Sequence, residues 1–371
     1  MDKLKPLEHK IKASFFCLFK IFLKIGIKEF KPLDGNKLKK VLFLRPEKIG
    51  DMVISFPVFD GLKKYYPNIG ISILGSPKNI ALIKNDKRFS KIFLYTKSLF
   101  KDINTFRKMR SENYDCVVDM ICDDSVTALF ISQIVSKGKP RIGVGKIKYQ
   151  KYYDFNYDHR MGNTGHIIEN TLKLLEAFNI NSSEISGYAT PYVDEQTDNE
   201  AKQFIRSIKD SNNSKLVGYN LSAGSPTRIW RIDKSISLVR SIVQSEMNSK
   251  VILFTTPNER KRGKKILSEF NENVFLVPDN LTLIQATALI KYLDILISPD
   301  TSLVHIARSF KVQVVGLYSR FMKNFLLWKP FGQENGSVVS DNDDNIHDIT
   351  VNQVFEEYLK LANNISSVGK R

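Results

Sequence analysis

Short apolar runs alternate with amphipathic segments from residue 40 onward. The first run, 41–44, is apolar at every position, as expected of a strand that is buried on both faces of a parallel sheet. A polar turn and an apolar-rich helix over 51–66 should follow it. Further strands are predicted at 71–74, 91–95 and 116–120, with helices at 77–84, 98–111 and 125–136. This α/β alternation predicts a parallel sheet covered by helices on both faces.

A polar stretch, NSSEISGYATPYVDEQT at 181–197, divides the chain after a predicted helix at 166–178. The alternation then begins again, with strands predicted at 216–221, 250–254, 274–277, 295–298 and 312–318 and helices at 198–210, 233–245, 260–270, 284–292 and 302–310. A chain of 371 residues exceeds the usual size of one domain. We therefore predict two domains of one architecture, 39–190 and 191–371, preceded by an arm, 1–38.

The arm is strongly basic. The first 40 residues hold 11 lysines against four acidic residues, which gives them +7 of the formal net charge of +17. Its most apolar stretch, 13–23, contains Lys20 and is too short to span a bilayer, and no small-residue cleavage site follows it. Interleaved lysines and phenylalanines predict a helix lying in an anionic membrane interface. The alternative is that the aromatic rings pack on the domain behind them while the lysines stay solvated.

Three scattered cysteines, Cys17, Cys116 and Cys122, form no CxxC pair and fit a reducing compartment such as the cytosol. Together with the basic arm they predict a cytoplasmic protein held peripherally at the inner face of the cytoplasmic membrane. The net charge also leaves a non-catalytic nucleic-acid-binding protein open. Its aromatic residues, however, lie mostly in apolar runs rather than as stacking platforms, so no nucleic acid is expected as a partner.

Ligands of open parallel sheets bind in the loops that follow the carboxyl ends of the strands. The first such loop is RPEKIGD at 45–51, where Lys48 and Gly50 precede Asp51. Gly50 permits close backbone approach, and Asp51 falls at or near the start of the next helix. Its carboxylate could act as a general base or could cap the helix. Spacing alone favours the cap.

Two loops of the second half carry a different chemistry. NLSAGSPTRIW at 220–230 offers small side chains and a cation, which are the groups that hold a diphosphate; they are Ser222, Gly224, Ser225 and Arg228. It lacks P-loop spacing, and an ordinary surface turn is the alternative. SPDTSLVHIA at 298–307 places Thr301 and Ser302 at a helix start suited to phosphate. Asp300 suits loop orientation or sugar hydroxyls, and His305 could be a core histidine or a group near the phosphates.

Several cofactor classes lack their motifs. No GxGxxG follows a predicted strand, which argues against a nicotinamide or flavin enzyme. The adjacent pairs Asp123–Asp124 and Asp343–Asp344 do not form a DxD metal motif, and the five histidines are widely spread. We therefore expect no metal and no resident cofactor, so that the charge of a bound diphosphate is met by cations and backbone N–H groups.

In their order, the three loops resemble glycosyltransferase family 9, the heptosyltransferases of the lipopolysaccharide inner core. The resemblance covers about residues 39–362 and is carried by VLFLRPEKIGDMVISFPVFDGLKKYYP, NLSAGSPTRIW and SPDTSLVHIARSFKVQVVGLYS, with counterparts in YDCVVDM, RIGVG, WKPFG and HDITVNQV. The family opens with an RxDRxGD loop and carries a later DTGxxH segment. Here Glu47 replaces Asp in the first motif and Ser302 replaces Gly in the second, while Arg231 and Thr255–Thr256 depart from the family near the donor site.

The resemblance implies a GT-B fold, in which two Rossmann-like domains set their parallel sheets facing across a cleft. It implies an inverting, metal-independent glycosyltransferase that moves heptose from ADP-heptose onto a lipopolysaccharide core or related anionic lipid-linked glycan. Asp51 matches the general base and Arg228 a basic residue at the donor phosphates. Glu259, Asp300, Thr301 and His305 match donor-binding positions, while Lys48 and Gly50 lie on the acceptor side. A family member with another nucleotide-sugar donor, or an epimerase on the same fold, is the alternative.

Overall fold

The computed structural model describes residues 23–26, 29–122, 124–158, 165–209 and 214–368. The chain folds as two compact units. The first comprises Met1–Lys48, Pro57–Thr164 and Ile168–Ser186, and the second Ile49–Phe56, Gly165–Ile167 and Gly187–Arg371. The amphipathic helix predicted within the arm lies outside the described residues, apart from the end of its sequence. Within the described part of the chain, no helix is long and apolar enough to cross a membrane.

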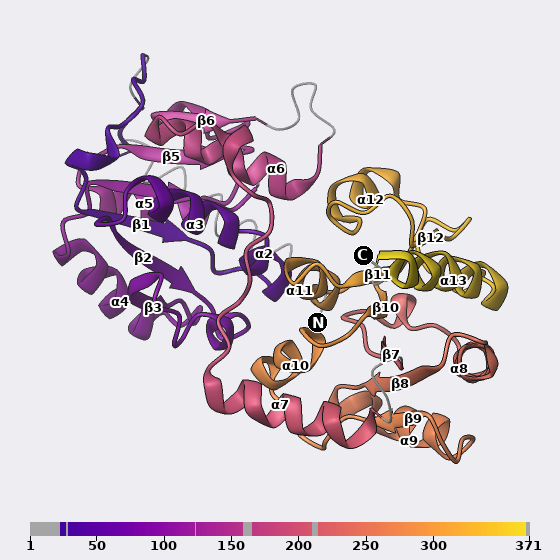
Figure 1. Cartoon of the computed structure of the whole chain (residues 1–371). Helices are drawn as coiled ribbons and strands as arrows, with labels where there is room; N and C mark the ends of the chain where they lie inside the picture. The colour runs from indigo at the N-terminus through magenta and orange to yellow at the C-terminus, as the bar shows by residue number, and fades with distance from the viewer. Residues whose placement is uncertain (1–22, 27–28, 123, 159–164, 210–213, 369–371) are drawn as a thin grey trace. The chain divides into compact units, whose positions relative to one another are not determined.

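The first unit is built on a six-stranded parallel sheet in the order β3-β2-β1-β4-β5-β6 (Figure 1). Its strands are β1 Lys40–Leu44, β2 Gly70–Gly75, β3 Phe89–Leu94, β4 Cys116–Asp119, β5 Arg141–Val144 and β6 Phe155–Tyr157. Its helices are α3 Phe56–Tyr65, α4 Leu99–Ser111, α5 Val126–Ser136 and α6 Ile167–Leu172, and shorter 3₁₀ turns include η4 Ile80–Leu82 and η6 Lys173–Phe178.

Alternate residues of β1 enter two different cores, which explains why the strand is apolar throughout. Leu42 and Leu44 pack in a cluster that takes Met109 from α4 and Ile131 from α5. Phe43 points to the opposite face, where its ring lies 5.0 Å from that of Phe59 on α3. Helices therefore cover both faces of this sheet, as the alternation predicts.

The helix predicted at 51–66 is wrong as a single element. It is two helices, α2 Ile49–Val53 and α3, separated at Ile54 and Ser55. The Ser55 hydroxyl donates to the Asp51 carbonyl oxygen over 2.8 Å and so competes for a helical acceptor. Pro57 has no N–H to donate to Val53, so the hydrogen-bond ladder of α2 cannot continue.

The helix predicted at 77–84 is also wrong, because only the 3₁₀ turn η4 forms there. Asn79 is fully buried, and its side-chain amide donates to the Arg45 carbonyl oxygen over 2.9 Å while accepting from the Ser76 N–H. These bonds fasten the segment to the first loop instead of leaving it free to form an α-helix.

The second unit repeats the design, with a six-stranded parallel sheet in the order β12-β11-β10-β7-β8-β9 (Figure 1). Its strands are β7 Lys215–Asn220, β8 Ser249–Phe254, β9 Val274–Leu276, β10 Ile295–Pro299, β11 Gln313–Tyr318 and β12 Ser337–Val339. Its helices are α7 Glu195–Ile208, α8 Ile232–Gln244, α9 Arg260–Leu267, α10 Leu283–Ile290, α11 Ser302–Ser309, α12 Met322–Trp328 and α13 Val351–Val368, with the 3₁₀ turns η8 Pro226–Arg228 and η9 Pro257–Glu259.

One continuous core joins this second sheet to the helices on one face. Val217 and Tyr219 of β7 pack with Leu238 of α8, Ile266 of α9 and Tyr358 of α13. On the opposite face α11 packs on β10 and β11, and α10 lies between α11 and α7. The helices α12 and α13 and the three-residue strands β6 and β12 were not predicted.

Candidate active site

Asn220 ends β7 and fastens two of the predicted loops together. Its buried side-chain amide donates to the Ser298 hydroxyl over 3.0 Å and to the Thr301 hydroxyl over 3.2 Å. The Oδ1 oxygen of the same side chain accepts from the Ser222 N–H over 3.0 Å. The loops after β7 and β10 are therefore one structure. The sequence places Asn220 in the second loop, but we predicted no role for it. A polar residue directly at the carboxyl end of a buried strand is the pattern that could have indicated one.

The three small residues predicted to contact the donor lie in different surroundings. Ser222 is buried, and its hydroxyl oxygen accepts from the Thr256 N–H over 2.8 Å, which joins this loop to the one after β8. Ser225 caps η8 by accepting from the Thr227 N–H over 3.4 Å. A Cβ built on Gly224 would meet no atom within 4 Å. The open part of the loop is therefore at Gly224 and Ser225, while Ser222 orders the loop.

Arg228 and Asp300 form an ion pair between the second and third loops. Arg228 Nη1 lies 3.0 Å from Asp300 Oδ2 and donates to the Asp300 carbonyl oxygen over 3.0 Å. The Arg228 side chain is 43% exposed and the Asp300 side chain 16%. The guanidinium is therefore partly open to solvent, and Asp300 links the second loop to the third. Loop orientation and contact with sugar hydroxyls both stay predictions for Asp300.

Thr301 occupies the N-cap position of α11 but makes no capping hydrogen bond with its side chain. Its hydroxyl instead lies 3.1 Å from that of Ser298. The Thr301 side chain does not cap the helix because the Asn220 and Ser298 side chains compete for the same hydroxyl. Ser302 follows as the first residue of α11. The Val304 N–H donates to the Thr301 carbonyl oxygen over 3.2 Å, so the first-turn N–H groups that the described residues leave for other acceptors are those of Ser302 and Leu303.

His305 is buried one turn into α11. Its ring centroid is 5.4 Å from that of Trp328. Burial lowers the pKa of His305, and the negative charges of Asp300 and Asp51 act in the opposite direction. In the part of the chain that the structure describes, neither ring nitrogen takes part in a hydrogen bond. The lowered pKa favours the neutral form of the His305 ring. A core histidine usually has a hydrogen-bonded ring nitrogen, and His305 differs from it in this respect.

α2 lies against α11 within the second unit, which brings the first loop to the donor helix. A Cβ on Gly50 would come within 3.1 Å of His305 Cδ2, so the small residue permits this approach. Asp51 is the third residue of α2 and lies inside its first turn. The N-cap interpretation of Asp51 is therefore wrong. Lys48 ends the first segment of the first unit.

The remaining predicted donor residue, Glu259, ends the 3₁₀ turn η9 after β8 and is half-buried. Its N–H donates to the Thr256 carbonyl oxygen over 3.1 Å, so it belongs to the loop that Ser222 binds. Among the described residues, no group of three or more His, Cys, Asp or Glu side chains is arranged to hold a metal ion.

Two residues that the sequence analysis did not select border this site. The buried hydroxyl of Tyr318, at the end of β11, has no hydrogen-bond partner among the described residues. Burial raises the pKa of Tyr318, and the negative charge of Asp300 adds to the effect. Trp230 donates from its indole nitrogen to the Ile349 carbonyl oxygen over 3.1 Å, and Arg262 donates to the Trp230 carbonyl oxygen. These bonds fix the end of the second loop.

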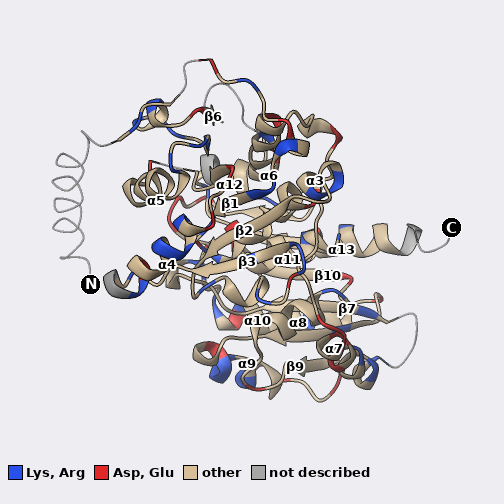
Figure 2. Cartoon of the chain, turned by 90° about the vertical axis from the view of Figure 1, so that its left-hand side faces the viewer, with Lys and Arg blue, Asp and Glu red and all other residues tan. Residues whose placement is uncertain are grey.

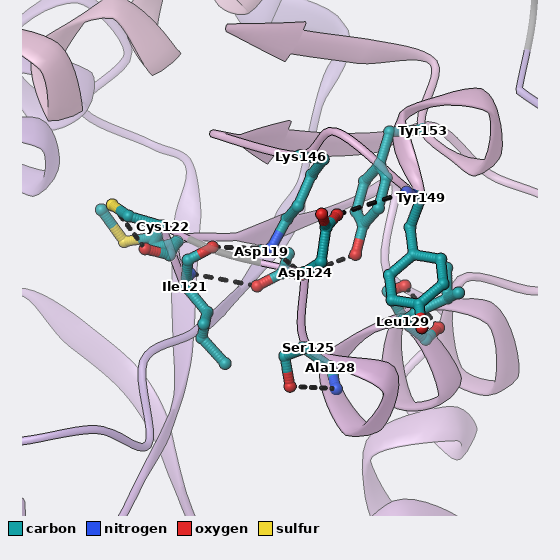
Figure 3. A network of polar contacts seen from close by, with 12 residues as sticks. Asp119, Ile121, Cys122, Asp124, Ser125, Ala128, Leu129, Lys146, Tyr149 and Tyr153 are labelled. Carbon is teal, nitrogen blue, oxygen red and sulfur yellow. Dashed lines mark hydrogen bonds and ion pairs between the residues drawn. The ribbon is translucent and has the colours of Figure 1, made fainter. Parts of the chain in front are cut away.

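The first unit holds a separate buried polar network at the ends of β4 and β5 (Figure 3). Lys146 Nζ lies 2.8 Å from Asp119 Oδ2 and donates to the Ile121 carbonyl oxygen over 2.6 Å. The Tyr153 hydroxyl donates to Asp119 Oδ2 over 2.5 Å. Burial, and then the negative charge of Asp119, raise the pKa of Tyr153. The network holds the loop between β5 and β6 against the end of β4.

Comparison with known proteins decides the family. The model of glycosyltransferase family 9 (heptosyltransferase) matches residues 103–359. The chain belongs to glycosyltransferase family 9. This family 9 chain is 22% identical over 307 residues to the lipopolysaccharide core heptosyltransferase OpsX of Haemophilus influenzae, covering 78% of the chain and 81% of that protein.

Two solved structures have the same fold as this family 9 chain. A glycosyltransferase family 9 structure from Veillonella parvula gives a TM-score of 0.74 at 16% identity, over 91% of this chain and all of that one (100%). The ADP-heptose lipopolysaccharide heptosyltransferase II of E. coli gives 0.67 at 17% identity, over 88% and 99%. The family resemblance and the GT-B fold of two parallel-sheet units are therefore confirmed, and the chain is a glycosyltransferase. The roles of the individual site residues stay predictions.

Proposed function

We propose that this family 9 chain is an inverting, metal-independent transferase that moves heptose from ADP-heptose onto a lipopolysaccharide core or a related anionic lipid-linked glycan. The names of OpsX and of E. coli heptosyltransferase II support the sugar, the nucleotide and the acceptor class. The observation that carries the proposal is the joining of the donor loops by Asn220 and by the Arg228–Asp300 pair, in the same unit as α2 with Asp51.

Asp51 is proposed as the general base. Its carboxylate takes the proton from the acceptor hydroxyl while the hydroxyl oxygen forms a bond to the anomeric carbon, and the bond from that carbon to the diphosphate oxygen breaks on the opposite face. The configuration at the anomeric carbon inverts. The step requires an ionised carboxylate, and Asp51 offers its side chain from the first turn of α2.

The departing nucleoside diphosphate takes the electron pair of the broken bond and needs positive charge around it. Arg228 supplies an exposed guanidinium, and the first-turn N–H groups of α11 supply donors that the Thr301 side chain does not cap. The Ser225 and Ser302 hydroxyls lie in the same loops. No resident metal or cofactor enters this scheme, because the protein's own cations and N–H groups meet the developing charge.

We also propose that the protein works in the cytoplasm at the inner face of the cytoplasmic membrane. The support is the charge of its first 40 residues, which is opposite to that of anionic headgroups. A lipid-linked acceptor would lie on the same surface, so membrane binding would raise the local concentration of the acceptor.

The Asp51→Asn variant tests the base. It should fold and bind nucleotide sugar as the wild type does, yet lose about 10²–10⁴ in turnover, the usual worth of a general base. Asp60→Asn, which removes an exposed carboxylate from the neighbouring helix α3, is the matched control. Near-normal transfer by Asp51→Asn would refute the assignment. The anomeric configuration of the product, read by NMR, tests inversion, and full activity after chelation of divalent ions tests metal independence.

The loop after β8 bears on the choice of donor sugar, because Thr256, whose N–H donates to Ser222, stands at a position where this chain departs from its family. A thermal-shift screen of ADP-, UDP- and GDP-sugars identifies the nucleotide, because a ligand that binds only the native state raises its unfolding temperature. A shift with ADP-heptose is expected. A shift with another nucleotide sugar alone would keep the transferase and replace its donor.

A further inference from the structure

The first unit carries a basic surface with two exposed isoleucines, built by a short strap and a loop. The strap is 23–26 and the loop is 145–152, between β5 and β6. The Gly26 N–H donates to the Lys151 carbonyl oxygen over 2.8 Å, which sets the two segments side by side. Leu23 of the strap packs on a cluster that includes Tyr149 of the loop. We call the exposed residues Lys24, Ile25, Ile147, Lys148 and Lys151 the strap–loop surface.

The two isoleucines of this surface are unusually exposed for apolar side chains. Ile25 is 67% exposed and Ile147 58%. The loop itself is firmly held, since the Asp124 carboxylate accepts from the N–H groups of Ile147 over 3.1 Å and of Lys148 over 2.9 Å. The exposed isoleucine is therefore a feature of a fixed loop and is presented to whatever lies outside it.

A lysine adjoins each isoleucine in the sequence, and two lysines of the loop lie over tyrosine rings. Lys148 Nζ lies 5.5 Å from the ring centroid of Tyr149, and Lys151 Nζ lies 5.3 Å from that of Tyr152. Both tyrosine rings are buried, so they act as fixed supports for the lysine stems. The sequence from 137 to 152 contains no Asp or Glu (lysines and arginines are blue in Figure 2). The lysines of this surface suit an anionic partner, and its isoleucines suit an apolar layer lying beneath that partner's charged groups.

The place of the strap in the chain points to the same partner. The strap follows directly on residues 1–22, which contain five lysines and four phenylalanines. Leu23 therefore connects residues 1–22 of the arm to the packed part of the first unit, two positions before Ile25. An amphipathic arm bound in a membrane interface would bring this surface to the same bilayer.

We propose that the strap–loop surface is a second membrane-docking site, which seats the first unit on an anionic phospholipid bilayer with Ile25 and Ile147 in the headgroup region. This rests on the proposed work of the enzyme at the membrane and adds to it a folded contact surface. Such a contact would fix the first unit at the membrane, whereas the arm alone would only tether it.

Vesicle binding by the full chain tests the proposal, without nucleotide sugar or acceptor. Vesicles of phosphatidylcholine alone are compared with equimolar phosphatidylcholine and phosphatidylglycerol. Two variants are made, Ile25→Ser with Ile147→Ser, and Lys148→Gln with Lys151→Gln. Each lysine near an anionic membrane surface strengthens binding by roughly five- to tenfold. The lysine variant loses two lysines and should therefore bind on the order of 30-fold more weakly.

Matched controls change the same side chains elsewhere. Ile103→Ser alters an isoleucine that is 45% exposed on α4, which packs on β3 at the other edge of the sheet. Lys264→Gln with Lys265→Gln removes the same charge from α9 of the second unit. Both controls should bind anionic vesicles as the wild type does.

The proposal is supported if the wild type binds the anionic vesicles, both strap–loop variants bind them more weakly, and the controls bind them as the wild type does. Unchanged binding of both variants overturns it, since the arm would then suffice. Equal binding to neutral vesicles, or a dimer in sedimentation that the isoleucine variant dissociates, also overturns it. Transfer to a soluble acceptor analogue should be unaffected in these variants, so a failure here is distinct from a failure of the proposed transferase activity.

Discussion

Lys146 can be changed to methionine with little change in the length of its stem, and the change isolates one buried charge. Lys146 and Asp119 are both fully buried, with side-chain exposures of 1% and 0%. In Lys146→Met the Asp119 carboxylate keeps the hydrogen bonds from Tyr153 and from the Ile121 N–H but loses its cation. The Ile121 carbonyl oxygen loses the Lys146 donor as well.

The expected loss follows from the cost of an uncompensated buried charge. Removing one partner of a buried ion pair costs about 3–5 kcal/mol of unfolding free energy. At roughly 2–4 °C per kcal/mol for a unit of this size, the first unit should melt about 6–20 °C lower. Asp119→Asn should behave similarly. The double variant Asp119→Asn with Lys146→Met buries no charge, so its loss should fall at least about 2 kcal/mol short of the sum of the single losses.

Urea unfolding of the four proteins gives the double-mutant cycle, and hydrogen exchange of β4 and β5 assigns the loss to the first unit. Lys360→Met, which breaks an exposed pair with Glu357 on α13, is the control and should leave stability unchanged. A loss below about 1 kcal/mol for Lys146→Met, or additive single losses, would refute the reasoning that this pair is dry and strongly coupled.

Further predictions concern acid stability, packing and the donor. Burial lowers the pKa of His166 from 6.5 to about 3, so as the pH falls the unfolded chain binds this proton before the folded chain does. The free energy of unfolding should therefore fall by up to about 1.4 kcal/mol per pH unit from pH 6.5 towards 3. If His166→Phe showed the same dependence of unfolding free energy on pH, this prediction would be contradicted. Gly218→Ala places a Cβ 2.4 Å from Leu293 Cδ1 and should cost roughly 1–3 kcal/mol in urea unfolding, whereas Gly224→Ala should cost nothing. Arg228→Ala should weaken donor affinity by roughly tenfold or more in calorimetry, and an unchanged affinity would remove Arg228 from the site.

The sequence determined the architecture, because the signal for a buried parallel strand is local. The 41–44 run is apolar at every position, and β1 is buried on both faces for that reason. The same holds for the loops at the carboxyl ends of β7 and β10, since a strand fixes where its loop begins. Helix starts with a side-chain cap could also be read, as at Ser125 before α5.

Only the tertiary structure decided how those loops are used. Arg228 and Asp300 are 72 residues apart in sequence, and their pairing changed Asp300 from an unexplained anion into the partner of a cation. The Asp51 N-cap interpretation failed because the start of α2 depends on contacts beyond its own five residues. The burial of Lys146 against Asp119 is equally invisible in a linear pattern, where a lysine next to an exposed loop looks solvated. The periodicity of apolar side chains indicates which face of a strand or helix a residue lies on. The residue that it contacts is decided by packing between segments that are distant in the chain.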